Sequence, residues 1–227
     1  MREIVLDTET TGLDPLTGDR IVEIGAVELL NHMPTGRTFH KYINPQRDMP
    51  AEAFAVHGLS AEFLADKPLF AAVVDEFVTF IGDAHLVIHN ASFDMKFLNA
   101  ELEWASKPIL PMGRAKDTLD LARRRFPGAQ NSLDALCRRF GVDNSSREKH
   151  GALLDSELLA EVYLELIGGR QPDFALSVVR NGAAEISDDW APPKRPRTLP
   201  PRLTPEERAA HAEFVAELGD AALWGRR

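Results

Sequence analysis

Residues 4–15 read IVLDTETTGLDP, and this stretch decides the fold. Three apolar β-formers run directly into Asp7 and Glu9, and Gly12 and Pro15 then end the segment. A run that is apolar on both faces is typical of a central strand covered on both sides. Because side chains alternate along a strand, we expect Asp7 and Glu9 to point to the same face, at the strand's carboxyl end.

Two carboxylates on one face of a strand end repel each other. A hard divalent cation would remove that repulsion, which makes the pair a candidate metal site. The alternative is a pair of solvated turn residues that also serve as helix caps, because Asp and Glu are common in turns. This segment alone leaves the two interpretations about equally open.

The composition is that of one large domain, or of one domain with an appendage. The chain has 227 residues, is 44% apolar and carries one cysteine, Cys137, at a spacing that indicates packing. A single cysteine excludes an intramolecular disulfide and is typical of a reducing compartment. No signal peptide and no stretch long enough to span a bilayer are visible, so we expect a soluble, cytoplasmic protein.

The net charge of −9 has the wrong sign for tight binding to the phosphates of a nucleic acid. If the substrate is DNA or RNA, metal ions must offset the carboxylates locally, and something else must hold the strand in place.

The hydrophobic pattern predicts strands first, then a strand and helix alternation, then helices. Strands are expected at 20–30, 37–45 and 85–90, and helices at 68–82, 93–105, 118–126, 132–141 and 152–169. A polar turn containing Pro34 and Gly36 is expected between the second and third strands. This order predicts an α/β domain over residues 1–170, a mixed sheet with helices packed on it.

The composition changes after residue 170. Residues 171–227 hold seven of the 15 prolines, and 171–203 is predicted to be a flexible, proline-rich linker. Residues 204–227 are predicted to form a helical tail, because Thr204 can cap a helix and Glu207 completes a capping box.

The tail helix needs a surface to pack on. It is too short to be stable alone in water, yet Phe214 and Leu218 belong to an apolar stripe. Docking on a partner is favoured over packing back on the chain's own domain, which stays open as the alternative.

Further acids follow other predicted elements. Asp94 ends HNASFD (89–94) just after a buried strand, and KHGALLD (149–155) supplies His150 and Asp155. Strand ends and helix starts meet at one edge of an α/β sheet, so four carboxylates would share a cleft there. At an effective dielectric constant of ~20, like charges ~4 Å apart repel by ~4 kcal/mol per pair. Such a cluster needs cations, and oxygen ligands favour Mg²⁺ or Mn²⁺ over zinc.

His150 and Asp155 cannot share a helix face, because five residues correspond to about 140° of rotation. His150 is therefore expected in the loop before a helix that carries Asp155. A neutral imidazole there could take a proton from water, although a histidine in a loop is more often only solvated.

Four motifs resemble those of the DEDDh 3′→5′ exonucleases, which share a ribonuclease H-like fold. They are DTETTG (7–12), HNASFD (89–94), DTLDLAR (117–123) and HGALLD (150–155). The stretches 53–60 and 124–169 are most similar to the proofreading subunits of bacterial replicative DNA polymerases. The resemblance is strong over residues 1–170 and weak in the tail.

The resemblance implies a role for each site residue. Two divalent cations, Mg²⁺ or Mn²⁺, would be held by Asp7, Glu9, Asp94 and Asp155. His150 would be the general base, and the terminal nucleotide would be contacted by Thr10, Glu52, His57 and Phe93. Without the resemblance, Glu52 and His57 would be interpreted as caps of a helix near Ser60, and Phe93 as core. Asp117 is expected to support the site without binding metal.

The implied activity is the release of 5′-mononucleotides from the 3′ end of single-stranded DNA. The implied partners are the catalytic subunit of a replicative polymerase, a sliding clamp bound through QPDFAL (171–176), and a small accessory subunit. No association with a membrane is expected. Two alternatives stay open. One is an RNA 3′→5′ exonuclease of the same chemistry, since no side chain distinguishes the two sugars. The other is a non-catalytic scaffold that links polymerase and clamp.

Overall fold

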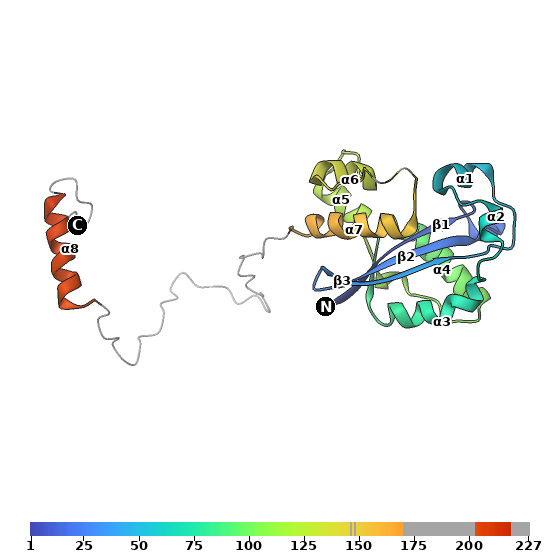
Figure 1. Cartoon of the computed structure of the whole chain (residues 1–227), viewed down its shortest axis with the longest axis horizontal. Coiled ribbons are helices and arrows are strands. Elements are labelled where there is room, and N and C mark those ends of the chain that lie inside the picture. The colour runs from blue at the N-terminus through green and yellow to red at the C-terminus, as the bar shows by residue number, and fades with distance from the viewer. Residues whose placement is uncertain (146, 148, 170–202, 219–227) are drawn as a thin grey trace, which may run out of the picture. The chain divides into compact units, whose positions relative to one another are not determined.

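The computed structural model describes residues 1–169, apart from 146 and 148, and residues 203–218. They belong to two units, an α/β domain and the single helix α8 (Pro205–Glu217) (Figure 1). The clamp-binding peptide expected at 171–176 and nearly all of the expected linker lie outside the described residues.

A five-stranded mixed sheet is the middle layer of the α/β domain. Its strands are β1 (Arg2–Thr10), β2 (Ile21–Leu30), β3 (Met33–Tyr42), β4 (His85–Ile88) and β5 (Ala115–Asp117). The strand order is β3-β2-β1-β4-β5, with β1, β2 and β3 antiparallel and with β4 and β5 parallel to β1. The predicted central position of β1 is confirmed. The carboxyl ends of β1, β4 and β5 therefore meet at one edge of the sheet.

The hairpin between β2 and β3 is tighter than the sequence predicted. The expected turn around Pro34 and Gly36 is wrong, because both residues lie inside β3. The chain reverses instead at Asn31 and His32, which have φ values of 51° and 66°. Because β3 is an edge strand, a proline is tolerated there: its missing N–H can face away from the sheet.

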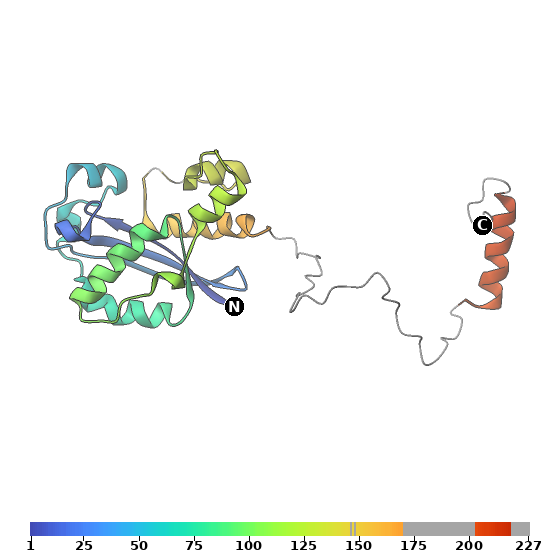
Figure 2. The ribbon, with the colours of Figure 1, turned by 180° about the vertical axis from the view of Figure 1, so that it is seen from behind.

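Helices cover both faces of the sheet (Figure 2). One face packs against α3 (Phe70–Ile81) and α4 (Ala91–Trp104). The other face packs against α7 (Ala152–Leu166). Helix α7 in turn contacts α5 (Thr118–Arg125) and α6 (Leu133–Phe140). The alternation along β1 produces this layering. Ile4 and Leu6 lie in the core beneath α3 and α4, whereas Val5 packs on the α7 side.

Helix ends follow the signals in the sequence. The Ser132 hydroxyl accepts a hydrogen bond from the Ala135 amide and caps α6, which ends at Gly141 in the left-handed conformation. In α8 the predicted capping box is confirmed, since Thr204 and Glu207 exchange side-chain and backbone hydrogen bonds. Within the described part of the chain, no helix has the length and apolar character needed to cross a bilayer.

A glycine in β2 allows α7 to approach the sheet. A Cβ atom on Gly25 would lie 2.1 Å from backbone atoms of Ala152 and Leu153, so no larger residue fits. The Ser156 hydroxyl also donates a 2.9 Å hydrogen bond to the Gly25 carbonyl. Because Gly25 is the sheet partner of Asp7, this contact brings the start of α7 next to the end of β1.

Candidate active site

The four predicted acids come from three elements and lie together at the sheet edge. Asp7 and Glu9 stand near the end of β1, Asp94 in the first turn of α4 and Asp155 in the first turn of α7. Glu9, Asp94 and Asp155 are buried. One ligand atom from each of Glu9, His150 and Asp155 lies within 4.8 Å of the others. Asp7 is near enough for the other three acids to raise its pKa.

Burial and mutual repulsion make this cluster costly to charge. Burial, with Asp94, Glu9 and Asp155 around it, raises the pKa of Asp7 well above its ordinary value. Burial first, then the neighbouring acids, raises the pKa of Glu9 to about 8. Burial also raises the pKa of Asp94 to about 7, although the Thr8 amide and hydroxyl donate to its Oδ1. The cluster therefore attracts cations.

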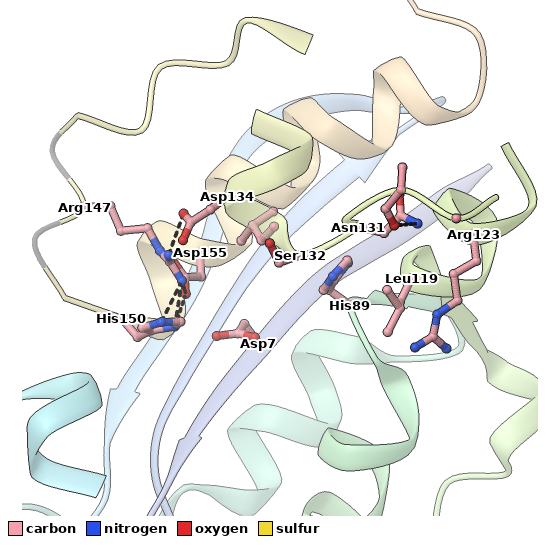
Figure 3. A pocket seen from close by; sticks show the side chains of 13 residues that line it. Asp7, His89, Leu119, Arg123, Asn131, Ser132, Asp134, Arg147, His150 and Asp155 are labelled. Atoms are coloured by element: carbon pink, nitrogen blue, oxygen red, sulfur yellow. Dashed lines mark hydrogen bonds and ion pairs between the residues drawn. The ribbon is translucent and has the colours of Figure 1, made fainter. Parts of the chain in front are cut away.

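A protein cation already lies against the cluster. Nε and Nη2 of Arg147 donate to the two carboxylate oxygens of Asp155 at 2.5 and 2.7 Å, and Nη1 donates to Asp134 at 2.8 Å (Figure 3). Burial acts to raise the pKa of Asp155, but His150 and Arg147 outweigh it and hold that pKa below its ordinary value. The Arg147 side chain is only 7% exposed, so its charge is compensated by these acids and not by water.

The donor set fits magnesium-like ions. All four acids offer hard oxygen atoms, and the guanidinium of Arg147 shows that positive charge is stable at Asp155. Sequence reasoning did not single out Arg147. A basic residue in a polar loop looks the same whether it is solvated or folded back onto an acid.

His150 lies in the loop before α7, where the helix geometry required it. Its amide donates to the Val56 carbonyl at 3.2 Å, which ties this loop to α1 (Ala51–His57). Nη2 of Arg147 lies 2.6 Å from its Nδ1. The same Nδ1 lies 3.2 Å from Oδ2 of Asp155. Because a guanidinium can only donate and a carboxylate can only accept, the first contact is satisfied by an Nδ1 without a proton and the second by a protonated one. The side chain is about half exposed, so water can reach it.

A pocket of about 460 Å³ adjoins the cluster on the side of Glu9. Its lining includes all four residues expected to contact a nucleotide, Thr10, Glu52, His57 and Phe93. The interpretation of Glu52 and His57 as helix caps is wrong, because both lie within α1. Ser60 itself caps the next helix, α2 (Ala61–Leu64).

His57 is arranged to donate a hydrogen bond in this pocket. Its Nδ1 accepts from the Leu59 amide at 3.0 Å, so the proton is on Nε2. Nε2 is buried and has no hydrogen-bond partner at normal distance among the described residues. Burial lowers the pKa of His57, and the smaller, opposite effect of the Thr10 carbonyl does not outweigh it. A ligand hydroxyl or carbonyl would satisfy it.

A larger cavity of about 670 Å³ adjoins the cluster on the other side. It is lined by Asp7, His150 and Asp155 and extends past His89 to Arg123 (Figure 3). Sequence reasoning gave His89 no role. The structure places it in this cavity, with its Nδ1 2.9 Å from the Thr118 hydroxyl.

Asp117 supports the site as the sequence suggested. Its carboxylate accepts hydrogen bonds from the amides of Asn90, Ala91 and Leu119, so it holds the starts of both α4 and α5. These bonds fix the turn that presents Asp94.

Comparison with known proteins gives the family. The sequence model of the RNase_T exonuclease family matches residues 4–163. The chain is 52% identical over 225 residues to DNA polymerase III subunit epsilon of Rickettsia conorii, covering 96% of each chain. It is 44% identical over 238 residues to DNA polymerase III subunit epsilon of Escherichia coli strain K12, covering 98% of this chain and 97% of that one. The chain belongs to the DNA polymerase III epsilon family of exonucleases.

Solved structures of other exonucleases have a similar fold. Exonuclease X in complex with 5′ overhanging duplex DNA is 27% identical, with a TM-score of 0.57 over 73% of this chain and 90% of that chain. The nuclease domain of 3′hExo, a DEDDh family member bound to rAMP, is 19% identical, with a TM-score of 0.64 over 73% of this chain and 91% of that chain. The second likeness shows the shared fold alone. The predicted ribonuclease H-like architecture is confirmed.

Replacing Arg147 by methionine should destabilise the protein in EDTA. The change removes one partner of a buried ion pair, which typically costs about 3–5 kcal/mol. The folded-state pKa of Asp155 is lowered, so the pair stabilises the fold above the unfolded pKa of that acid and stops doing so as pH falls through the folded pKa. The deficit in melting temperature should therefore be present at pH 7 and shrink in strong acid.

Magnesium should restore much of the lost stability of this variant, because an ion can replace the guanidinium at Asp155. Melting curves with EDTA and with Mg²⁺ measure both effects. Arg138→Met is the matched control, since Arg138 is exposed on α6. Equal melting temperatures for wild type and Arg147→Met in EDTA would show that the ion pair does not stabilise the fold.

Proposed function

We propose that this chain is the proofreading 3′→5′ exonuclease of a bacterial replicative DNA polymerase. It hydrolyses the 3′-terminal phosphodiester of single-stranded DNA and releases 5′-mononucleotides. The observation that supports this most strongly is a cluster of four acids at one sheet edge, three of them buried, flanked by a nucleotide-sized pocket. Membership of the epsilon family agrees with it.

In this proposal the cluster holds two divalent cations through Asp7, Glu9, Asp94 and Asp155. When bound, such ions supply activation of water and stabilisation of charge on the leaving 3′ oxygen. Mg²⁺ is the favoured ion and Mn²⁺ the alternative. The two hydrogen bonds from Thr8 orient the carboxylate of Asp94.

The remaining residues move the proton and hold the substrate. A P–O bond forms to the water oxygen, the P–O3′ bond breaks, and His150 takes the proton of the water. The terminal nucleotide occupies the 460 Å³ pocket, where Nε2 of His57 donates to it and Glu52, Thr10 and Phe93 line the walls.

Digestion of a mismatched primer terminus tests this function. A 5′-labelled DNA primer with a 3′ mismatch should be shortened from its 3′ end, with 5′-mononucleotides as the only small product, and only when Mg²⁺ or Mn²⁺ is present. An RNA of the same sequence should be cut more slowly. Products with 3′-phosphates, cleavage in EDTA, or faster cleavage of RNA would each contradict the proposal.

The tail is proposed to dock on the catalytic subunit of the polymerase. The relatives are named as subunits of DNA polymerase III, and a chain with a net charge of −9 needs a partner that grips the duplex. The side chains of Phe214 in α8 and of Leu218, which directly follows this helix, are exposed, as an unfilled docking face would be.

Deleting residues 200–227 should abolish co-elution with the polymerase catalytic subunit of the same bacterium. Hydrolysis of short single-stranded DNA should stay within about twofold of wild type, because the site lies wholly in the α/β domain. The full-length Phe214→Ser, Leu218→Ser variant should behave like the deletion. Loss of nuclease activity together with binding would instead favour packing of the tail on its own domain.

Three further parts of the proposal come from the family resemblance. They are contact with a sliding clamp through residues 171–176, association with a small accessory subunit, and a cytoplasmic location beside the replicase.

A further inference from the structure

A fifth buried acid lies beside the cluster. Glu23 is on β2, where it is the direct sheet partner of Glu9 on β1. Residues directly opposite on antiparallel strands point to the same face, with Cβ atoms about 4.5–5.5 Å apart. Both acids are buried, so water screens their charges poorly. Glu9 and Glu23 therefore form a like-charge pair across the two strands, which destabilises a sheet.

Glu23 stands outside the group of residues that can hold an ion directly. Among the described residues, that group is Glu9, His150 and Asp155. Oε1 of Glu23 lies 2.7 Å from Nε2 of His40, which belongs to β3. A carboxylate can only accept, so the imidazole donates this hydrogen bond. The bond holds the Glu23 carboxylate toward β3, where it can act on an ion at Glu9 through its charge but not as a ligand.

The charge of Glu23 reaches Glu9 strongly. After burial and Asp155, Glu23 contributes most to raising the pKa of Glu9, more than Asp94 does. Asp94 is itself one of the four acids of the cluster. Glu23 is therefore near enough to Glu9 to act as a further member of the cluster in electrostatic terms, although it comes from another strand and faces another hydrogen-bond partner.

The fold does not need this charge. A glutamine at position 23 would accept the same hydrogen bond from His40 and would not repel Glu9. The His40 ring is also packed by other contacts, since it lies edge-on to Tyr42 with ring centroids 4.8 Å apart. Tyr42 in turn packs against Phe63 at 5.0 Å. A divalent cation held by Glu9 is the group that gains from a second negative charge at this place.

We propose that Glu23 raises the affinity of the acid cluster for divalent cations through its charge, acting beside Glu9 and without contacting the ion. This inference rests on the cation sites of the proposed function and adds to them a residue that sets their affinity. Glu23 costs stability in the metal-free protein and strengthens cation binding, so the two effects have opposite signs.

Glu23→Gln tests the proposal, because it removes the charge and keeps the acceptor for His40. Calorimetry with Mn²⁺ and no DNA should show a Kd about tenfold higher than that of the wild type. The melting temperature in EDTA should rise, because the repulsion of Glu9 is gone. Glu23→Asp keeps the charge, and its Kd should stay within about threefold of the wild-type value. A merely structural role would instead lower stability and affinity together.

Nuclease assays give a second measurement of the same effect. In Glu23→Gln, the Mn²⁺ concentration that gives half of the maximal rate should rise by the same factor as the Kd. The maximal rate at saturating Mn²⁺ should fall by less than about twofold, because no group that touches the substrate has changed.

Glu28→Gln is the matched control. Glu28 is a buried acid on the same strand, so the change in net charge is the same. Its sheet partner is Ile4, which faces the core beneath α3 and α4, so Glu28 lies on the other face of the sheet. Its loss should lower the melting temperature, because Glu28 pairs with Arg2 and Arg37, and should leave the Kd for Mn²⁺ unchanged.

Three results would overturn the inference: an unchanged Kd in Glu23→Gln, an equal rise of the Kd in Glu28→Gln, or a lower melting temperature of Glu23→Gln in EDTA. The proposed function fails separately. A wild-type protein that binds Mn²⁺ more tightly than Glu23→Gln, yet releases no nucleotide, would contradict that function and support the role of Glu23.

Discussion

Replacing Asp7 by alanine should abolish nucleotide release, with a loss greater than the about 10²–10⁴-fold that a general base supplies. Asp7 is the acid on which the other three converge, since Asp94, Glu9 and Asp155 all add to the effect of burial on its pKa. Without it the cluster loses one of the four carboxylates that are proposed to hold the two ions, so both roles of the ions would fail together. The measurement is the rate of 5′-mononucleotide release from single-stranded DNA at saturating Mg²⁺.

The matched control for this experiment is Asp120→Ala, which removes an exposed acid from α5 and should leave the rate unchanged. Circular dichroism should show that the Asp7 variant is folded, because removing one of four repelling acids relieves strain in the cluster. A rate within about tenfold of wild type would contradict the metal assignment, since a general base alone contributes more.

Replacing His150 by alanine should lower the rate by about 10²–10⁴-fold and leave cation binding nearly intact. The imidazole is half exposed and lies beside Asp155, where it can reach a water at the acids. The backbone of the loop should persist, because the amide of residue 150 still donates to the Val56 carbonyl. Single-turnover rates and Mn²⁺ affinity from calorimetry separate the two effects.

Lys149→Ala serves as the control, since Lys149 is the exposed neighbour in the same loop. A His150→Ala enzyme that runs near the wild-type rate at saturating Mg²⁺ would show that another group takes the proton. An equal loss of Mn²⁺ affinity and rate would make His150 a ligand and not a base.

Local patterns predicted most of the fold. The apolar run before Asp7 has no polar face, which only a central strand satisfies, and β1 is central. The predictions failed where tertiary context decides. Pro34 and Gly36 sit inside β3 because an edge strand tolerates them, and β5 has too few residues to show a period.

The acids of the site were predictable, but the groups that support them were not. Asp7 and Glu9 stand out because two carboxylates end an apolar run. The role of Arg147, by contrast, can be recognised only in the folded chain, where Asp155 and Asp134 from two helices lie next to it. The 670 Å³ cavity likewise exists only after α5, α6 and β4 have packed, so no spacing in the sequence shows it.

Anomalous diffraction from crystals of the wild-type protein soaked in Mn²⁺ tests the central claim most directly. Two peaks a few ångströms apart should appear among the carboxylates of Asp7, Glu9, Asp94 and Asp155, with the guanidinium of Arg147 displaced from Asp155. No peak among these four acids, in crystals whose dissolved protein still releases nucleotides with Mn²⁺, would contradict the claim.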